Sequence, residues 1–130
     1  MTPSEKSSPE VVCLVDDDFA VLRSIGRLLA SDGFIACPFD KPKDFLAHLG
    51  THEVPLVVLD IWMREMNGLD VQAQISALSP GTRVIVITGR EDTKAKEAVL
   101  RGGAIAYFHK PFDDGEFLGA VRAGLSMQVQ

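Results

Sequence analysis

The run Val-Val-Cys-Leu-Val-Asp-Asp-Asp at residues 11–18 decides the fold of this chain. Its first five residues are apolar, with no alternation of polar and apolar side chains. That pattern is typical of a strand covered on both faces, as in a parallel sheet. Three aspartates follow at once, and Asp18 is placed to cap the next helix. The run therefore predicts a buried strand with carboxylates at its carboxyl end.

Apolar runs of the same kind recur along the chain and alternate with stretches of helical periodicity. The later runs lie at residues 34–37, 54–59, 84–87 and 104–108. The run at 34–37 is short and precedes Pro38, so it is predicted to be an edge strand. Helices are predicted between Asp18 and Gly33, from Pro42 to Gly50, around Val71, Ile75 and Leu78, from Thr93 to Arg101, and from Asp113 through Leu125.

This order of elements indicates an α/β fold of the doubly wound (βα)5 type, with a parallel sheet between two layers of helices. Crossovers in such sheets are right-handed, so helices cover both faces. Ligands bind outside the carboxyl ends of the strands. The residues that directly follow each strand are therefore the ones that indicate function.

Length and composition restrict the classes of protein that fit. The chain has 130 residues, which predicts one domain over residues 11–127, a disordered polar lead-in at 1–10 and a short tail at 128–130. Its net charge of −5, without a basic stripe, argues against nucleic-acid binding. No apolar run has the roughly 18 residues of a membrane helix, and the polar N-terminus is no signal peptide.

Two cysteines, Cys13 and Cys37, lie in apolar surroundings. Without a secretion signal they are expected to be buried thiols in a reducing compartment, which predicts a cytoplasmic protein. His48 and His52 are four residues apart, but Gly50 lies between them. They are therefore interpreted as surface histidines and not as a metal-binding pair.

Polar side chains end four of the predicted strands: Asp16 and Asp17 the first, Asp60 the third, Thr88 the fourth and Lys110 the fifth. Carboxylates crowded at one edge repel each other and favour a bound cation. Oxygen ligands alone point to a hard ion, Mg²⁺ or Mn²⁺. An ammonium and a hydroxyl beside that ion fit a phosphoryl group, and a lone carboxylate can act as its nucleophile.

With these motifs the sequence resembles the receiver domains of bacterial response regulators. The matching segments are LVDDD at residues 14–18, VLDIWM at 58–63, NG at 67–68, VITG at 86–89, GA at 103–104 and YFHKPF at 107–112. The resemblance extends over residues 11–127. It implies a flavodoxin-like three-layer sandwich with a five-stranded sheet in the order 2-1-3-4-5.

The resemblance also implies a role for each motif residue. Asp60 is the expected phosphoacceptor, and Mg²⁺ is expected on Asp16, Asp17, Asp60 and the backbone carbonyl of Trp62. Thr88 and Lys110 are expected to contact the phosphoryl group, and Tyr107 to change rotamer on activation. The expected donor is a sensor histidine kinase or a phosphotransfer protein.

The output surface implied by the resemblance consists of the helix at 93–101, the strand at 104–108 and the helix that begins at 113. It is expected to change on phosphorylation and to bind a partner or a second copy of the chain. Self-phosphorylation and slow hydrolysis are the only reactions expected, so the chain is not a turnover enzyme. Binding to a membrane is not expected.

Three residues at the rim of the predicted site need separate comment. Arg64 occupies a position where the family usually has proline, and is interpreted as a solvated surface residue. Trp62 and Arg90 each lie two residues beyond a site residue. They are predicted to shield the phosphorylated aspartate from water and so to set its lifetime.

Two alternatives stay open at this point. The first alternative is a degenerate receiver that binds partners without phosphorylation, and Arg64 in place of the usual proline weakly favours it. The second alternative is a phosphatase that forms an aspartyl-phosphate intermediate. Enzymes of that kind carry their nucleophile at the end of the first strand, whereas the lone aspartate here ends the third.

Overall fold

Five parallel strands form one sheet in the order β2-β1-β3-β4-β5 in the structure, a computed structural model that describes residues 10–127. The strands are β1 (Val11–Val15), β2 (Ile35–Phe39), β3 (Leu56–Asp60), β4 (Arg83–Thr88) and β5 (Ala106–His109). The predicted fold class and strand order are confirmed. The predicted tail, and the predicted lead-in apart from Glu10, lie outside the described residues.

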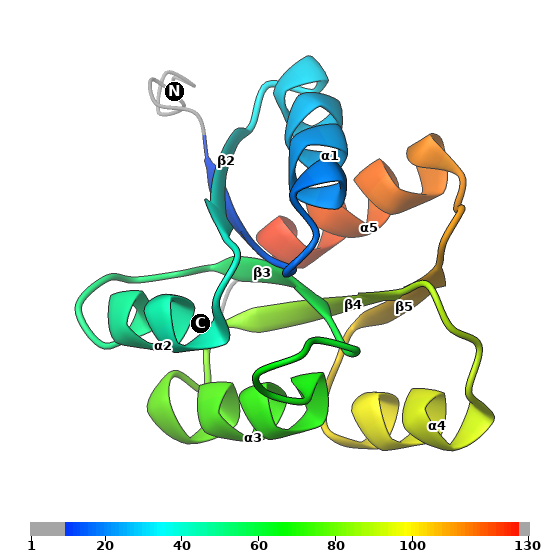
Figure 1. Cartoon of the computed structure of the whole chain (residues 1–130). Helices are drawn as coiled ribbons and strands as arrows, with labels where there is room; N and C mark the ends of the chain where they lie inside the picture. The colour runs from blue at the N-terminus through cyan, green and yellow to red at the C-terminus, as the bar shows by residue number, and fades with distance from the viewer. Residues whose placement is uncertain (1–9, 128–130) are drawn as a thin grey trace.

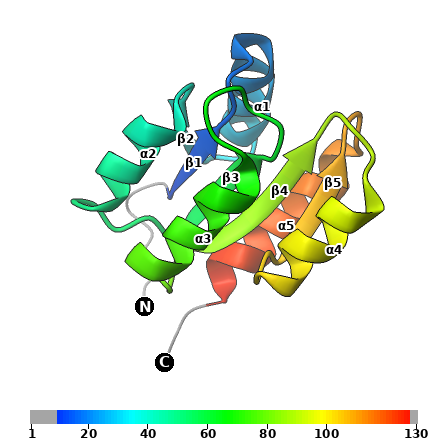
Figure 2. The same cartoon turned by 60° about the horizontal axis from the view of Figure 1, so that its bottom comes forward.

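Helices cover both faces of this sheet. They are α1 (Phe19–Ser31), α2 (Pro42–Leu49), α3 (Gly68–Leu78), α4 (Thr93–Arg101) and α5 (Asp114–Ser126). Figure 1 shows α1 and α5 on one face and α2, α3 and α4 on the other. In Figure 2 the face covered by α2, α3 and α4 has come forward, with α3 and α4 in front of the sheet. No helix among residues 10–127 is long and apolar enough to span a membrane.

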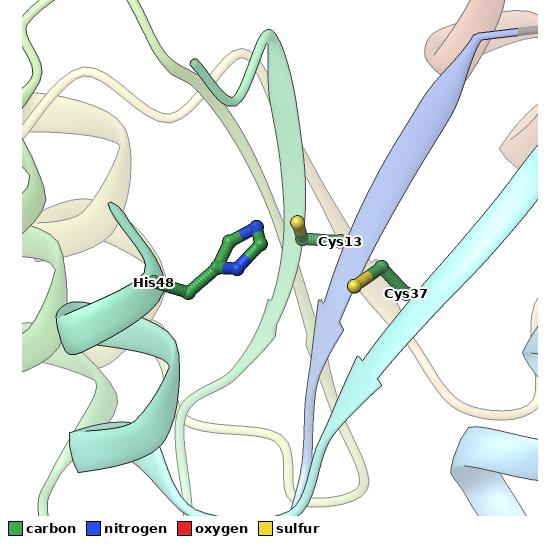
Figure 3. A group of neighbouring side chains, drawn as sticks. All are labelled: Cys13, Cys37 and His48. Carbon is green, nitrogen blue, oxygen red and sulfur yellow. The ribbon is translucent and has the colours of Figure 1, made fainter. Parts of the chain in front are cut away.

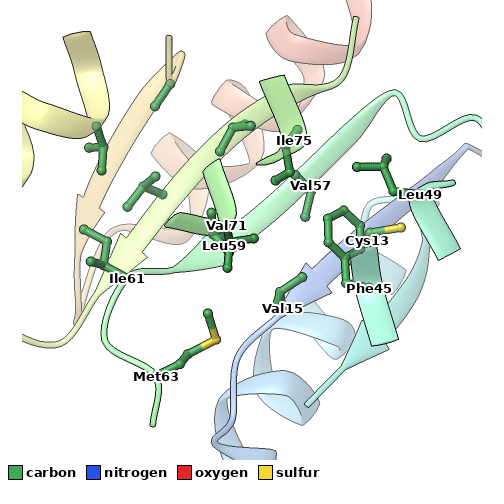
Figure 4. Packing of buried hydrophobic residues seen from close by; sticks show 14 of the residues in the cluster. Cys13, Val15, Phe45, Leu49, Val57, Leu59, Ile61, Met63, Val71 and Ile75 are labelled. Carbon is green, nitrogen blue, oxygen red and sulfur yellow. The ribbon is translucent and has the colours of Figure 1, made fainter. Parts of the chain in front are cut away.

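Successive side chains of β1 point to opposite faces of the sheet, so they contribute to two separate halves of the core. Val12 and Leu14 pack in the cluster beneath α1 and α5. Cys13 and Val15 belong to the cluster on the opposite face, where Figure 4 shows Cys13 near Phe45 of α2. All of β3 is buried, which explains why its sequence is apolar without a period of two.

Capping residues mark the start of α1 and of α5 and the end of α1. Asp18 accepts hydrogen bonds from the amides of Ala20 and Val21, and Asp113 accepts one from the amide of Glu116. Gly33, with φ of 87°, takes the left-handed conformation just beyond α1. These predicted ends of α1 and α5 are confirmed.

Several details of the prediction were wrong. The strands expected at 54–59, 84–87 and 104–108 run from 56 to 60, from 83 to 88 and from 106 to 109. The second strand was expected at 34–37 but runs from Ile35 through Pro38 to Phe39, because an edge strand tolerates a proline on its unpaired side. Leu78 was expected to face the core but is exposed, since α3 ends at this residue and the chain turns away. Cys37 was expected to be buried, but its edge strand leaves it half-buried.

The start of α3 is pressed against the end of β3. The amide of Gly68 donates to the carbonyl of Ile61 at 2.7 Å. A Cβ atom at Gly68 would lie 2.5 Å from Cα of Ile61 and 2.7 Å from the carbonyl oxygen of Asp60. Both of these atoms are backbone, so a rotamer change cannot relieve the contact.

We therefore expect Gly68→Ala to lower the free energy of unfolding by about 2–3 kcal/mol through overpacking. Gly119 is the matched control, because it is helical and a Cβ there meets no atom within 4 Å. Gly119→Ala should raise stability by about 0.5–1 kcal/mol. Urea denaturation of both variants measures the difference. Equal stabilities would show that β3 and α3 do not need this close approach.

Candidate functional site

Three aspartates meet at the carboxyl ends of β1 and β3. Asp16 and Asp17 directly follow β1, and Asp60 is the last residue of β3. Each offers a carboxylate oxygen, and these oxygens all lie within 4.8 Å of one another. Asp16 and Asp60 are buried, whereas Asp17 is half-buried. The topology thus brings together residues separated by more than forty positions in the sequence.

Burial and crowding raise the pKa of two of these carboxyl groups. Burial, and next the charge of Asp16, raise the pKa of Asp60 to about 7. Burial also raises the pKa of Asp16. Lys110 opposes this effect, because its Nζ lies 3.3 Å from Oδ2 of Asp16. The site therefore has more negative charge than one lysine balances, and it favours a further cation.

Thr88 and Lys110 complete the predicted set at the ends of β4 and β5. Thr88 is fully buried. Its hydroxyl donates to the carbonyl of Arg90 at 2.9 Å and accepts from the amide of Arg90 at 3.1 Å. The hydroxyl is therefore engaged by the loop that leads from β4 to α4.

Arg64 contributes a contact that the sequence did not indicate. Its backbone amide donates to Oδ2 of Asp17 at 2.9 Å, and its Nε lies 3.6 Å from the same oxygen. The side chain is 89% exposed, in agreement with the interpretation as a surface residue. A proline at this position would have no N–H to donate. The departure from the family pattern thus places a hydrogen-bond donor on one of the three aspartates.

Trp62 and Arg90 lie against each other at the rim. The guanidinium carbon of Arg90 stands 4.1 Å from the centroid of the Trp62 ring, which is a cation–π contact. The indole Nε1 is buried and has no hydrogen-bond partner within residues 10–127. The sequence placed both residues at the rim but did not show that they pair, because nothing local links positions 62 and 90.

Tyr107 lies on β5, next to α4. It is half-buried, and Nζ of Lys96 lies 5.5 Å from the centroid of its ring. Burial raises the pKa of its hydroxyl, and Asp92 and Glu91 raise it further. This side chain therefore links the sheet to the helix whose entry loop engages Thr88.

The donor set fits a hard divalent cation. It consists of carboxylate oxygens on two neighbouring strands, with no thiol or imidazole among them. Burial, and next the charge of Asp16, raise the pKa of Asp60, and a bound cation would offset the second of these effects. The expectation of Mg²⁺ or Mn²⁺ thus agrees with the geometry of the residues.

The fold and this acidic site together define a doubly wound α/β domain with a candidate cation site at the carboxyl ends of its strands. The family model of the response regulator receiver domain matches residues 12–122, and the chain belongs to this family. It is 36% identical to the response regulator protein TodT of Pseudomonas putida and 32% identical to nodulation protein W of Bradyrhizobium diazoefficiens. Both matches cover 92% of this chain, which spans about half (53%) of either protein.

Solved structures agree with this assignment. FixJ-N has a TM-score of 0.86 at 26% identity, with coverage of 95% of this chain and 98% of that chain. A response regulator receiver domain protein from Methanospirillum hungatei has a TM-score of 0.85 at 27% identity, covering 91% and 94% of the two chains. The beryllofluoride-activated NtrC4 receiver domain dimer has a TM-score of 0.84 at 26% identity, covering 88% and 95%.

The raised pKa of Asp60 makes stability depend on pH in the metal-free protein. Its pKa is about 7 in the fold against an ordinary value of 3.8, so the folded state binds more protons between these values. The free energy of unfolding from this group therefore falls as pH rises from about 4 to about 7. Asp60→Asn should consequently raise the Tm over wild type at roughly pH 8 and have little effect at roughly pH 4. Thermal unfolding at both pH values tests this, and a Tm difference that does not vary with pH would contradict it.

Proposed function

We propose that Asp60 accepts a phosphoryl group from the phosphohistidine of a partner protein. A carboxylate oxygen of Asp60 attacks phosphorus, the P–N bond breaks, and the imidazole keeps the electron pair and takes up a proton. The observation that carries this proposal is the position of Asp60. It is a buried carboxylate opposite Asp16 and Asp17, with Lys110 at the same edge.

Asp16, Asp17, Asp60 and the backbone carbonyl of Trp62 are the groups that would hold Mg²⁺ or Mn²⁺. When bound, such an ion neutralises the carboxylates and the phosphoryl oxygens and so lets the two anions approach. Lys110 contributes a further positive charge to the phosphoryl oxygens, and Thr88 a hydroxyl donor. The amide of Arg64 occupies one lone pair of Oδ2 of Asp17, which leaves Oδ1 and the second lone pair of Oδ2 for the ion.

Phosphorylation changes the output surface, which consists of α4, β5 and α5. The Thr88 hydroxyl turns from the backbone of Arg90 toward the new phosphoryl oxygens, and the loop before α4 moves with it. Only Ala95 and Val99 of α4 are buried, so this helix has a small apolar anchor. Tyr107 then turns into the space that the loop leaves, which shifts the surface between two populations.

The partners follow from this chemistry. A sensor histidine kinase or a phosphotransfer protein donates the phosphoryl group, and a second copy of the chain binds through the output surface. A receiver dimer among the structural neighbours supports the second of these. We place the receiver at residues 11–127, in the cytoplasm, with phosphorylation and slow hydrolysis as its reactions. A degenerate receiver is disfavoured because all five site residues are present at one edge of the sheet.

Incubation with acetyl phosphate and Mg²⁺ tests the proposal. We expect the mass of the intact wild-type chain to rise by about 80 Da, one phosphoryl group. Asp60→Asn should stay unmodified, because an amide is a far poorer nucleophile than a carboxylate. Asp18→Asn is the matched control, since Asp18 caps α1 and lies outside the acidic site. Phosphorylation of Asp60→Asn to the wild-type extent would refute the assignment.

Trp62 and Arg90 are proposed to set the lifetime of the phosphorylated state. Hydrolysis needs water in line with the bond between Asp60 and phosphorus, and the paired indole and guanidinium cover the rim. The double variant Trp62→Asn, Arg90→Ala should lose its phosphoryl group more than about fivefold faster, or ~1 kcal/mol in barrier height. Trp62→Phe keeps a ring for Arg90 and should decay at close to the wild-type rate. The mass of the protein over time after donor removal measures the decay, and a double variant within about twofold of wild type would disprove shielding.

A further inference from the structure

A second group of metal-ligating side chains lies between α2 and the two strands at the β2 edge of the sheet, away from the acidic site. Cys13 of β1, Cys37 of β2 and His48 of α2 each offer one ligand atom, and these atoms all lie within 4.8 Å of one another. Figure 3 shows both sulfurs and the imidazole directed toward a common region between the two strands and α2. Phosphoryl transfer makes no use of any of the three.

Pairing of the strands accounts for the two thiols. Cys13 and Cys37 are direct partners in the parallel register of β1 and β2, so their side chains project from the same face of the sheet. Residues 13 and 37 are 24 positions apart, and only the register brings the sulfurs together. Since the register is held by both neighbouring pairs, Val12 with Ala36 and Leu14 with Pro38, the thiols keep this arrangement.

Two rings pack against the imidazole. The ring of His48 packs against Phe39 with a centroid distance of 5.1 Å, and it stacks on His52 at 4.0 Å. His48 lies one turn from the buried Phe45, on the side of α2 that meets the sheet. The interpretation of His48 as a plain surface histidine was thus incomplete, because it took no account of what lies beneath α2.

We propose that Cys13, Cys37 and His48 form a binding site for a thiophilic divalent cation, with Zn²⁺ as the ion it fits. Two thiolates and one imidazole are ligands that Zn²⁺ prefers, and magnesium does not. Bond lengths of 2.0–2.3 Å place tetrahedral ligand atoms roughly 3.5 Å apart, so shifts of about 1 Å close the site. Cys37 and His48 are half-buried, which leaves the fourth position to a water molecule.

Charge balance explains how the site changes on binding. Burial, and next the neighbouring Cys37, raise the pKa of the Cys13 thiol to about 12, so the metal-free thiol is protonated and unreactive. Binding of one Zn²⁺ releases the two thiol protons to solvent and leaves a neutral cluster of the ion, two thiolates and one imidazole. A neutral cluster suits the apolar surroundings of Cys13, which is 1% exposed. A high thiol pKa also disfavours disulfide exchange between these cysteines.

The ion would add a direct link between α2 and the paired strands β1 and β2. It links α2 to β1 and to the edge strand β2, and it stabilises the folded state by mass action. The site stands on the α2 side of β1, three residues before Asp16, so it is separate from the acidic site. Its occupancy does not depend on phosphorylation.

Metal titration of the reduced chain tests this proposal, with excess Mg²⁺ present to occupy the acidic site. We expect one equivalent of Zn²⁺ to bind, and Co²⁺ used as a probe to give a thiolate-to-metal charge-transfer band. Cys37→Ser and His48→Gln change partly exposed residues and should fold, and each should weaken Zn²⁺ binding at least about tenfold. His52→Gln is the matched control, because His52 stacks on His48 without belonging to the cluster, and it should bind as wild type does.

Variants of the acidic site show which of the two clusters holds the metal. Asp17→Asn and Asp60→Asn should retain the Co²⁺ band, since they alter the acidic site alone. A band lost in Asp17→Asn but kept in Cys37→Ser would overturn the proposal, and so would the absence of any thiolate band in wild type. A mass about 2 Da lower in the reduced preparation, the sign of a disulfide, together with no Zn²⁺ uptake would overturn it as well.

Discussion

Crowding of Asp16, Asp17 and Asp60 is the constraint on which the rest of the receiver depends. Parallel pairing of β1 with β3 brings their carboxyl ends together and leaves the carboxylates no room to separate. Each donor nearby offsets part of the negative charge: the ammonium of Lys110, the amide of Asp18 on Asp16 and the amide of Arg64 on Asp17. Burial, and next the charge of Asp16, raise the pKa of Asp60, and the crowded carboxylates favour a bound cation.

The central strands and α4 differ in how firmly they are anchored in the core. β3 and β4 are buried along nearly their whole length, so the strand that carries Asp60 is held rigidly. α4 contributes only two buried residues to the core, and its entry loop is tied to Thr88 by hydrogen bonds of the hydroxyl. In the proposed function, a phosphoryl group on Asp60 would compete for that hydroxyl. A rigid strand that carries Asp60 next to a loosely anchored helix suits the proposed shift between two populations.

The sequence predicted the features that depend on a strand and on the residue directly after it. Asp16, Asp60 and Thr88 were found in this way, because parallel topology brings strand ends to one edge whatever the rest of the chain does. Features that need register or side-chain contacts were not found. The cluster of Cys13, Cys37 and His48 depends on the pairing of β1 with β2, and Leu78 faces solvent because α3 ends there. The amide of Arg64 on Asp17 depends on the path of a loop, for which the sequence has no periodic signal.

Relief of carboxylate crowding by a divalent cation is the central claim, and thermal unfolding with and without Mg²⁺ at roughly pH 8 tests it most directly. The account predicts that Mg²⁺ raises the Tm of the wild-type chain, because the ion binds the folded acidic site and not the unfolded chain. It predicts little or no such rise in Asp17→Asn, whose fold and buried core are otherwise unchanged. A wild-type Tm that does not respond to Mg²⁺, or an equal rise in Asp17→Asn, would contradict it.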